Sequence, residues 1–295
     1  MLDIKTNGFC SPSVPITNPK CFNDNDLSTI ISVYNSTHPD TIKLTVKDKY
    51  GAINRRLKPI LGNKKHWLWC DYLATISKNS DSIMQLKLIA DNRLLPPQPK
   101  SWKTNKYEWL SNFDLENLLQ KYHNAPKYKY HFIGVKDHDF GLKNMDGTCM
   151  IDSDCDIDIK SIIQKGKHFV GIIIYKNEHW RSLFIVLLPQ YNAYGTYYYD
   201  SVGTGMPSEL KIYTDTVNKQ LKTIFPTHKA PIFKESKYRM QQSSYACGLF
   251  QATFQIKFPE LLLQNDKCMF KDFAKLNPTD KNVWKYRDEL YRERL

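Results

Sequence analysis

Three consecutive segments of this chain are rich in β-branched and aromatic residues and are separated only by short polar turns. They are HFVGIIIY at 168–175, WRSLFIVLL at 180–188 and YGTYYYD at 194–200. Such residues fit the pleated surface of a half-buried sheet, so the pattern predicts three successive strands. A sheet of this kind must cover its apolar faces with other elements, and we expect an α+β fold.

Helical spacing flanks the predicted strands on both sides. Leu27, Ile30, Ile31 and Tyr34 follow each other at helical intervals and predict a helix over 26–36. The other predicted elements are a helix from Ser111 or Asn112, a helix over 207–225 that Pro207 and Ser208 open, a strand over 230–234, and a helix that begins at Cys247 and that Pro259 ends.

A proline-rich segment, LLPPQPKSWKTNK at 94–106, is the best candidate for a linker. We therefore expect a small, mainly helical and basic N-terminal module over 1–95 and a larger domain over 106–295. The whole chain has 295 residues, 41% of them hydrophobic and 13% aromatic, which is enough for a packed core and excludes a disordered or fibrous protein.

The chain carries a strong positive charge, with 42 Lys and Arg against 30 Asp and Glu and a formal net charge of +12. Such an excess predicts an acidic partner, for example nucleic acid, an anionic surface or an acidic protein. Arg55, Arg56 and Lys58 would contact nucleic acid from the N-terminal module, although a solvated basic face is the stronger interpretation.

The sequence contains no segment that resembles a membrane span or a signal peptide. Its longest strongly apolar run, Leu183–Leu188, is far shorter than the roughly 18 residues that cross a bilayer. We therefore expect a reducing compartment. The cysteines are odd in number and form no CxxC pair, so we expect thiols at all seven positions: Cys10, Cys21, Cys70, Cys149, Cys155, Cys247 and Cys268.

One of these cysteines, Cys247, follows a polar segment and directly precedes a predicted helix, in QQSSYACGLF at 241–250. The free N–H groups and the dipole of a helix N-terminus stabilise a thiolate, which makes Cys247 a candidate nucleophile. Gly248 beside it would let a substrate backbone approach closely. For the cysteine taken alone, a buried structural thiol is the stronger interpretation.

Residues upstream of Cys247 favour its interpretation as a nucleophile. His179 and Trp180 lie at the turn between two predicted strands, and Asp200 ends the third. A carboxylate fixed at the end of a buried strand can orient an imidazole, and we expect Asp200 to accept a hydrogen bond from Nδ1 of His179. The amide of Gln241 or of Gln242 would join the backbone N–H of Cys247 in stabilising an oxyanion.

The order His179, Asp200, Gln241, Cys247 resembles the superfamily of ubiquitin-like-protein proteases and adenovirus-type maturation proteases. Its signature is His-Trp between strands, an aromatic strand ending in Asp-Ser, and Gln-x5-Cys-Gly opening the central helix; this chain has all three. The segment Trp109–Asn112 is similar to the Trp-Leu-polar entry of the family's first helix. The resemblance covers about residues 106–260 and implies a papain-like cysteine protease domain with a mixed central sheet flanked by helices.

The resemblance also implies a function. Deconjugating members usually have Asp before the nucleophile, where this chain has Ala246, and the whole layout is similar to the polyprotein-processing proteases of nucleocytoplasmic large DNA viruses. It implies a late viral endopeptidase, without metal or cofactor, that acts in virion maturation at host cytoplasmic assembly sites and in the virion. Its substrates would be viral polyproteins cleaved at Gly-containing sites, with Trp180 covering a narrow channel.

Two other functions stay open. One is an isopeptidase of the deSUMOylase or deubiquitinase type, which uses the same chemistry. The other is a nucleic-acid-binding assembly protein with an inactive protease-like domain, suggested by the positive charge, although the joint presence of His179, Asp200 and Cys247 argues against it.

Three further patterns are weaker candidates for sites. The pair His66–Trp67 repeats His-Trp but no strand ending in Asp follows it closely. The run Asp152–Asp158 resembles the opening of a calcium loop, but Ile157 stands where the sharp turn needs Gly. Finally, His123, His131 and His138 precede Cys149 and Cys155 at spacings that match no usual zinc site.

Overall fold

The computed structural model describes residues 9–15, 20–62, 65–105, 107–151, 153–276 and 279–295. The chain forms two compact units, one of Met1–Lys103 with Asp288–Leu295 and one of Thr104–Arg287. Within the described ranges, no helix combines the length and the apolar character that crossing a membrane would require.

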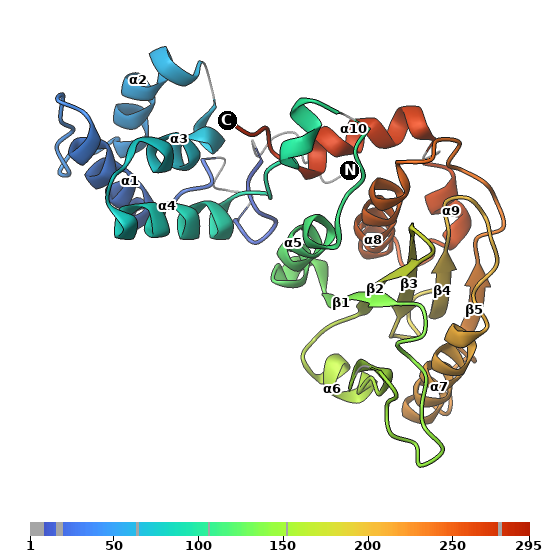
Figure 1. Ribbon diagram of the computed structural model, residues 1–295. Helices are drawn as coiled ribbons and strands as arrows, with labels where there is room; N and C mark the ends of the chain where they lie inside the picture. The colour runs from blue at the N-terminus through green and yellow to red at the C-terminus, as the bar shows by residue number, and fades with distance from the viewer. Residues whose placement is uncertain (1–8, 16–19, 63–64, 106, 152, 277–278) are drawn as a thin grey trace. The chain divides into compact units, whose positions relative to one another are not determined.

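A five-stranded sheet with the order β1-β2-β3-β4-β5 forms the centre of the second unit (Figure 1). The strands are β1 (Tyr130–Asp137), β2 (Phe169–Lys176), β3 (His179–Val186), β4 (Gly195–Tyr199) and β5 (Ile232–Glu235). The pairs β1/β2 and β4/β5 are parallel, whereas β2/β3 and β3/β4 are antiparallel, so the sheet is mixed. The predicted strands are confirmed. Strand β1 was not predicted, because its largely half-buried residues at the edge of the sheet give no clear alternation.

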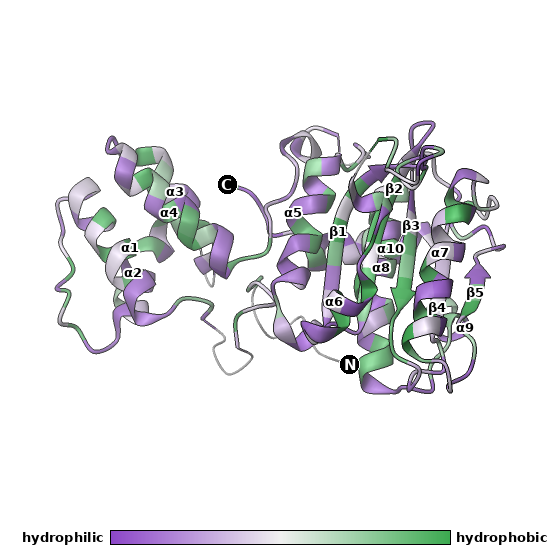
Figure 2. Ribbon diagram, turned by 90° about the horizontal axis from the view of Figure 1, so that it is seen from below, coloured by the Kyte–Doolittle hydropathy of each residue, from purple (hydrophilic) through white to green (hydrophobic). Residues whose placement is uncertain are grey.

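Helices cover both faces of this sheet. They are α5 (Asn112–His123), α6 (Ile159–Gln164), α7 (Glu209–Ile224), α8 (Cys247–Gln264), α9 (Phe270–Ala274) and α10 (Asp280–Leu290). Helices α6 and α7 pack on one face, where Ile162 and Val217 join Ile172 and Leu183 in a buried core. On the other face α8 places Phe254 against strand β3, and Figure 2 shows the hydrophobic residues concentrated in the central strands.

Helix α8 begins at Cys247, as the sequence predicts, but it does not end at Pro259. It continues to Gln264. A proline inside a helix removes one backbone hydrogen bond and favours a kink or an end. Here Phe258 and Leu262, on either side of the proline, are both buried, and their packing outweighs the missing bond.

Every helix or strand among the described residues of the first unit is a helix. Its elements are α1 (Asp24–Thr37), α2 (Lys49–Leu61), the short helix η2 (His66–Leu68), α3 (Trp69–Ile76), α4 (Ser80–Arg93) and the short helix η3 (Lys100–Lys103). The helix predicted over 26–36 is confirmed as α1, which Asn23 caps in a capping box with Asp26.

The two units differ from the predicted domain extents of 1–95 and 106–295, because residues 96–103 and 288–295 both pack in the first unit. Arg292 explains the C-terminal part. Its buried guanidinium contacts both carboxylate oxygens of Asp71, at 2.5 and 3.1 Å, and donates from Nε to the carbonyl oxygen of Leu95. A buried arginine needs such partners, and residues 67–95 of the first unit supply them.

The expectation that all seven cysteines are thiols is wrong. Disulfide bonds join Cys10 to Cys21 and Cys149 to Cys155, which leaves Cys70, Cys247 and Cys268 free. The partners are 11 and 6 residues apart and meet through loop conformations that no spacing rule encodes. The odd count was misleading, because it includes three free thiols.

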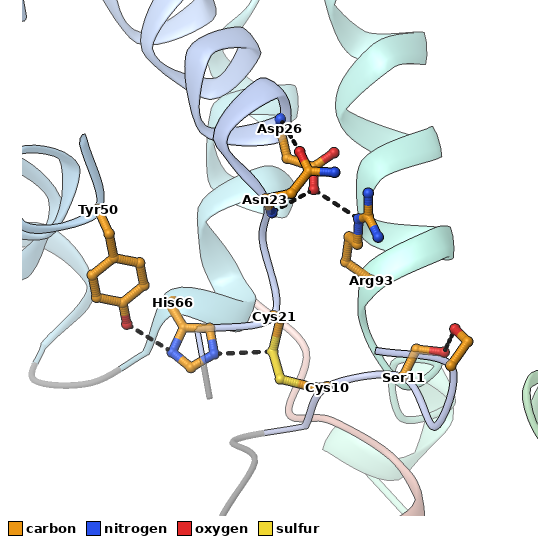
Figure 3. The surroundings of a disulfide bond; sticks show 9 residues. Cys10, Ser11, Cys21, Asn23, Asp26, Tyr50, His66 and Arg93 are labelled. Carbon is orange, nitrogen blue, oxygen red and sulfur yellow. Dashed lines mark hydrogen bonds and ion pairs between the residues drawn. A yellow bond between two sulfur atoms is a disulfide. The ribbon is translucent and has the colours of Figure 1, made fainter. Parts of the chain in front are cut away.

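Figure 3 shows the first disulfide, with the ring of His66 between Cys21 and Tyr50. Nε2 of His66 lies 3.4 Å from Sγ of Cys21, and Nδ1 lies 3.2 Å from the hydroxyl oxygen of Tyr50. Metal-ligating types of side chain also gather here and around Cys149, Cys155 and Asp156. At both places the sulfur atoms are bonded to each other, so no thiolate is available as a metal ligand.

Candidate active site

His179 and Asp200 come together because each lies at the end of a strand. His179 is the first residue of β3, and Asp200 directly follows Tyr199, the last residue of β4. Nε2 of His179 lies 2.8 Å from Oδ1 of the fully buried Asp200. We expected Nδ1 of His179 to make this bond, but Nε2 makes it. Nδ1 is therefore left for a second partner of the ring.

That other partner is Cys247, at the first position of α8. Cys247 is only 1% exposed, and its thiol interacts with the ring of His179. Burial lowers the pKa of His179, but the hydrogen bond with Asp200 and the interaction with Cys247 outweigh it and raise the pKa to about 9. The N-cap residue Ala246 makes no side-chain cap, so no such cap occupies the first-turn N–H groups that face the thiol.

The carboxylate of Asp200 accepts hydrogen bonds from four groups. Besides His179, they are Nε of Arg181 at 3.2 Å, the backbone N–H of Val202 at 2.9 Å and the hydroxyl of Thr204. Burial raises the pKa of Asp200, whereas the hydrogen bonds lower it and prevail, so its pKa lies below the ordinary value. Neither Arg181 nor Thr204 was predicted, because no spacing in the sequence connects them with the strand end.

The structure separates the two candidate glutamines. Gln241 is buried, with Oε1 accepting from the hydroxyl of Ser201 at 2.6 Å and Nε2 donating to the carbonyl oxygen of Ser243 at 2.6 Å. Gln242 has an exposed side chain. Only Gln241 is therefore held rigidly beside the strand end that carries Asp200.

The segment between Gln241 and Cys247 is anchored by Asp280, a residue that the sequence did not single out. Its carboxylate accepts hydrogen bonds from the backbone N–H groups of Gln242 and Ser243, at 2.8 and 3.0 Å, and from the hydroxyl of Ser243. These bonds fix the loop that leads into α8. Because Asp280 lies 33 positions after Cys247, only the folded chain shows the connection.

A cavity of about 520 Å³ has in its wall Trp180, the residue that follows His179 in the sequence. Its lining also includes Trp109, Leu110, Tyr175, Glu108 and Asp137. Gly248 is buried behind Trp180. A Cβ atom at Gly248 would lie 3.0 Å from Cβ of Leu110 and 3.3 Å from Cδ1 of Trp180. In this structure the space at Gly248 is thus filled by packing, where we expected an approach for substrate.

The weaker candidates have other contacts. His66 belongs to the first unit, next to the Cys10–Cys21 disulfide. Asp152 lies outside the described residues, whereas Asp154 and Asp156 pair with Lys136 and Lys143.

Of the three histidines weighed as zinc ligands, His123 accepts a hydrogen bond from the backbone N–H of Phe132, and its ring lies 4.9 Å from that of His131. His138 faces Glu209, with Nε2 3.5 Å from Oε1. Each of these rings thus has a local structural partner, while Cys149 and Cys155 are bonded to each other.

A mixed sheet with a cysteine at the start of the packed helix and a His–Asp pair at two adjoining strand ends is the architecture of the papain-like cysteine protease fold. Among solved structures, the chain resembles the ASFV pS273R protease, with a TM-score of 0.58 and 15% identity over 97% of this chain and 96% of that one. A Se-Met structure of the same protease gives a TM-score of 0.56 and 18% identity, covering 85% of this chain and 94% of that one.

A third similar structure is the C-terminal Ulp1 protease domain in complex with Smt3, the yeast ortholog of SUMO. Its TM-score is 0.36 at 13% identity, over 66% of this chain and 86% of that one. No protein-family model and no curated protein matches the sequence. The similarity to the ASFV protease covers residues of both units of this chain and is a similarity of fold.

Proposed function

We propose that this protein is a cysteine endopeptidase that processes viral structural polyproteins during virion maturation. The observation that carries the proposal is the ring of His179, which is hydrogen-bonded to the buried Asp200 and interacts with the buried thiol of Cys247. The fold shared with the ASFV pS273R protease supports it. We further propose that it acts at host cytoplasmic assembly sites and in the virion. The two disulfides contradict the seven thiols that we expected together with a reducing compartment.

The chemistry follows from the roles of these side chains. His179 takes the proton of Cys247, and the thiolate attacks the carbonyl carbon of the scissile peptide bond. The imidazolium then gives its proton to the leaving amine, and an acyl-enzyme thioester remains. Water, deprotonated by His179, attacks the thioester and releases the acid product. Asp200, bonded to Nε2, holds the ring in place throughout and leaves Nδ1 for the proton transfers.

The oxyanion of the tetrahedral intermediate needs donors close to Cys247. Nε2 of Gln241 has two N–H bonds, and the hydrogen bond with Ser243 uses one of them. The second N–H of Gln241 and the backbone N–H of Cys247 would bind the oxyanion. Loss of one such donor costs about 100-fold to 1,000-fold in kcat. We therefore expect this loss in Gln241→Ala and little change in Gln242→Ala, which serves as its matched control.

The cavity beside Trp180 supports a substrate with small residues before the scissile bond. Trp109 and Trp180 both line it, and we expect the two bulky indoles to favour glycine over larger side chains. Its lining also includes the carboxylates of Glu108 and Asp137, while Lys136 beside them is paired with Asp154. The two carboxylates would favour a basic side chain farther from the cleaved bond.

The test is cleavage of peptides with a Gly-Gly or Ala-Gly junction by the full chain and by Cys247→Ala. We expect cleavage by the wild type only. Cys268→Ala, which removes a free thiol of the same unit, is the matched control and retains activity. Failure of the wild type to cut any of these peptides would argue against the proposal. Labelling of Cys247 by a ubiquitin-like C-terminal probe, with all peptides left intact, would instead favour an isopeptidase.

A further inference from the structure

Arg181 lies two residues after His179 on strand β3 and contacts Asp200 as well as the turn before His179. Its Nε lies 3.2 Å from Oδ2 of Asp200, while Nε2 of His179 occupies Oδ1 of the same carboxylate. The side chain of Arg181 is 12% exposed and that of Asp200 is 0% exposed, so this ion pair is largely shielded from water. A buried ion pair is far less screened than one at the surface.

The turn that carries His179 has an unusual backbone. Asn177 and Glu178 both have positive φ, 51° and 56°, in the two-residue connection between β2 and β3. Two-residue hairpins of this type favour Asn-Gly, because a side chain at the second position costs energy in the left-handed region. Glu178 therefore needs support from outside the turn.

The guanidinium of Arg181 supplies that support. Its Nη1 donates to the carbonyl oxygen of Lys176, at 2.8 Å, and to that of His179, at 3.3 Å. These two carbonyl groups flank the turn, since Lys176 and His179 are paired across the hairpin. One side chain thus fixes the turn and, through Nε, joins it to the carboxylate that orients the catalytic ring.

The second consequence is electrostatic. Four donors fill the roughly four lone-pair positions of the Asp200 carboxylate, and two of them, His179 and Arg181, belong to side chains that carry positive charge. A carboxylate shared between two cations stabilises each of them less than it would stabilise one alone. With Arg181 in place, Asp200 increases the affinity of the ring of His179 for a proton less than it would with the ring as its one cationic partner.

We propose that Arg181 is a positioning residue of the active site, which anchors the turn carrying His179 and, by sharing the Asp200 carboxylate, limits how strongly that carboxylate holds a proton on His179. The inference rests on the proposed function and deepens it. No part of the sequence signature of the superfamily includes this arginine.

Other ionisable groups surround the pair, and the experiment must separate them from Arg181. Cys247 on α8 contacts His179 directly. Tyr198 and Tyr199 on β4, and Glu235 at the end of β5, interact electrostatically with Asp200 or with each other. Lys176 pairs with Glu209 at 3.2 Å. All of these residues are retained when Arg181 alone is replaced.

The measurement that tests the electrostatic part does not need a substrate. In protein labelled with 15N-histidine, NMR titration follows the ring of His179 among the eight histidines, and His179→Gln identifies its signal. We expect the pKa of His179 to rise by about 1 in Arg181→Met and in Arg181→Gln, because Asp200 then serves a single cation. Arg181→Lys keeps the charge and should leave this pKa near that of the wild type.

The anchoring part is tested by activity. All three variants lose the forked contacts with the turn, and we expect kcat/KM to fall by about 10-fold to 100-fold. The matched control is Lys234→Met, which removes one exposed positive charge from the same sheet and should change neither quantity.

Several outcomes would overturn the proposal. An unchanged pKa of His179 in Arg181→Met would do so, and so would unchanged kcat/KM in all three variants. If Arg181→Met loses its near-UV circular dichroism and is unfolded, Arg181→Gln and Arg181→Lys decide: equal His179 pKa values in these two variants would contradict a role for the charge. If the wild type cuts no peptide but its His179 titrates as expected across the series, the proposed function fails while the electrostatic inference holds.

Discussion

The indole Nε1 of Trp180 donates a hydrogen bond of 2.9 Å to the backbone carbonyl oxygen of Leu110. This bond joins the start of β3, which carries His179, to the segment that enters α5. Gly248, in the first turn of α8, packs against the same two side chains. Three elements that are distant in the sequence therefore meet at Trp180, which forms part of the wall of the cavity.

Replacing Trp180 with Phe keeps an aromatic ring but removes the N–H. The carbonyl of Leu110 would lose its partner, which costs about 1 kcal/mol in the free energy of unfolding. We expect KM for a Gly-Gly peptide to rise about 5-fold, corresponding to the same energy, with kcat little changed. Steady-state kinetics and urea denaturation measure both. Trp284→Phe, elsewhere in the second unit, is the control; an equal rise in KM there would show that the effect is not specific to the cavity.

The stability of the protein should fall between pH 6.5 and pH 9. The pKa of His179 is raised to about 9 in the folded protein, against an ordinary value of 6.5. A raised histidine pKa adds stability that is complete below pH 6.5 and is lost as the pH rises through 9. The full difference is roughly 3 kcal/mol in the free energy of unfolding. Urea denaturation at several pH values tests this. His179→Gln should lack this decrease, and a decrease of equal size in that variant would assign it to other groups.

Alkylation of the denatured, unreduced protein should modify three cysteines, Cys70, Cys247 and Cys268. Mass spectrometry of the peptides identifies them, and reduction before alkylation should raise the number to the seven that the sequence contains. Seven modified cysteines without reduction would contradict both disulfides.

Removal of the first disulfide by Cys10→Ser and Cys21→Ser should lower the free energy of unfolding by about 3 kcal/mol, as for other loops of this length. The bond closes a loop of 11 residues at the start of the first unit. The transition of that unit, followed by thermal denaturation, should move to lower temperature. Cys268→Ser provides the control, because its thiol is free.

Arg292 should be essential for the first unit. Replacing it with Ala leaves the carboxylate of Asp71 without its forked partner, and breaking a buried pair costs about 3 kcal/mol in the free energy of unfolding. The ion pair of Arg56 with Asp40, in which both side chains are over 40% exposed, gives the matched comparison. Arg56→Ala should cost less than about 1 kcal/mol. Equal losses in both variants would refute the structural role given to Arg292.

The sequence predicted much of the second unit because the proposed active-site residues lie at the ends of secondary structure elements. His179 begins a strand, Asp200 follows one and Cys247 begins a helix, and hydrophobic periodicity marks each of these ends. Hydrophobic periodicity cannot identify Arg181 or Asp280 as parts of the site. Their roles depend on which side of a hairpin a side chain lies on, and on where the last helix of the unit packs.

Other errors came from rules that tertiary packing overrides. Pro259 indicated a helix end, but buried neighbours on both sides keep α8 continuous. The linker prediction ended the first domain at 95, and the buried ring of Trp102, packed on Tyr291, extends it. The prediction that all cysteines are thiols failed for a different reason. Separations of 11 and 6 residues are compatible with a disulfide or with two free thiols.

If Cys247 is the nucleophile that we propose, its coexistence with two disulfides narrows the redox conditions under which this chain can work. A strong reductant that protects Cys247 would also open the Cys10–Cys21 bond, and an oxidant that preserves this bond threatens the thiol. Burial of Cys247 to 1% exposure reconciles these demands, because an oxidant must first reach a sulfur that the fold conceals. Activity measured across a series of glutathione buffers should therefore pass through a plateau at intermediate potentials and decline toward both extremes.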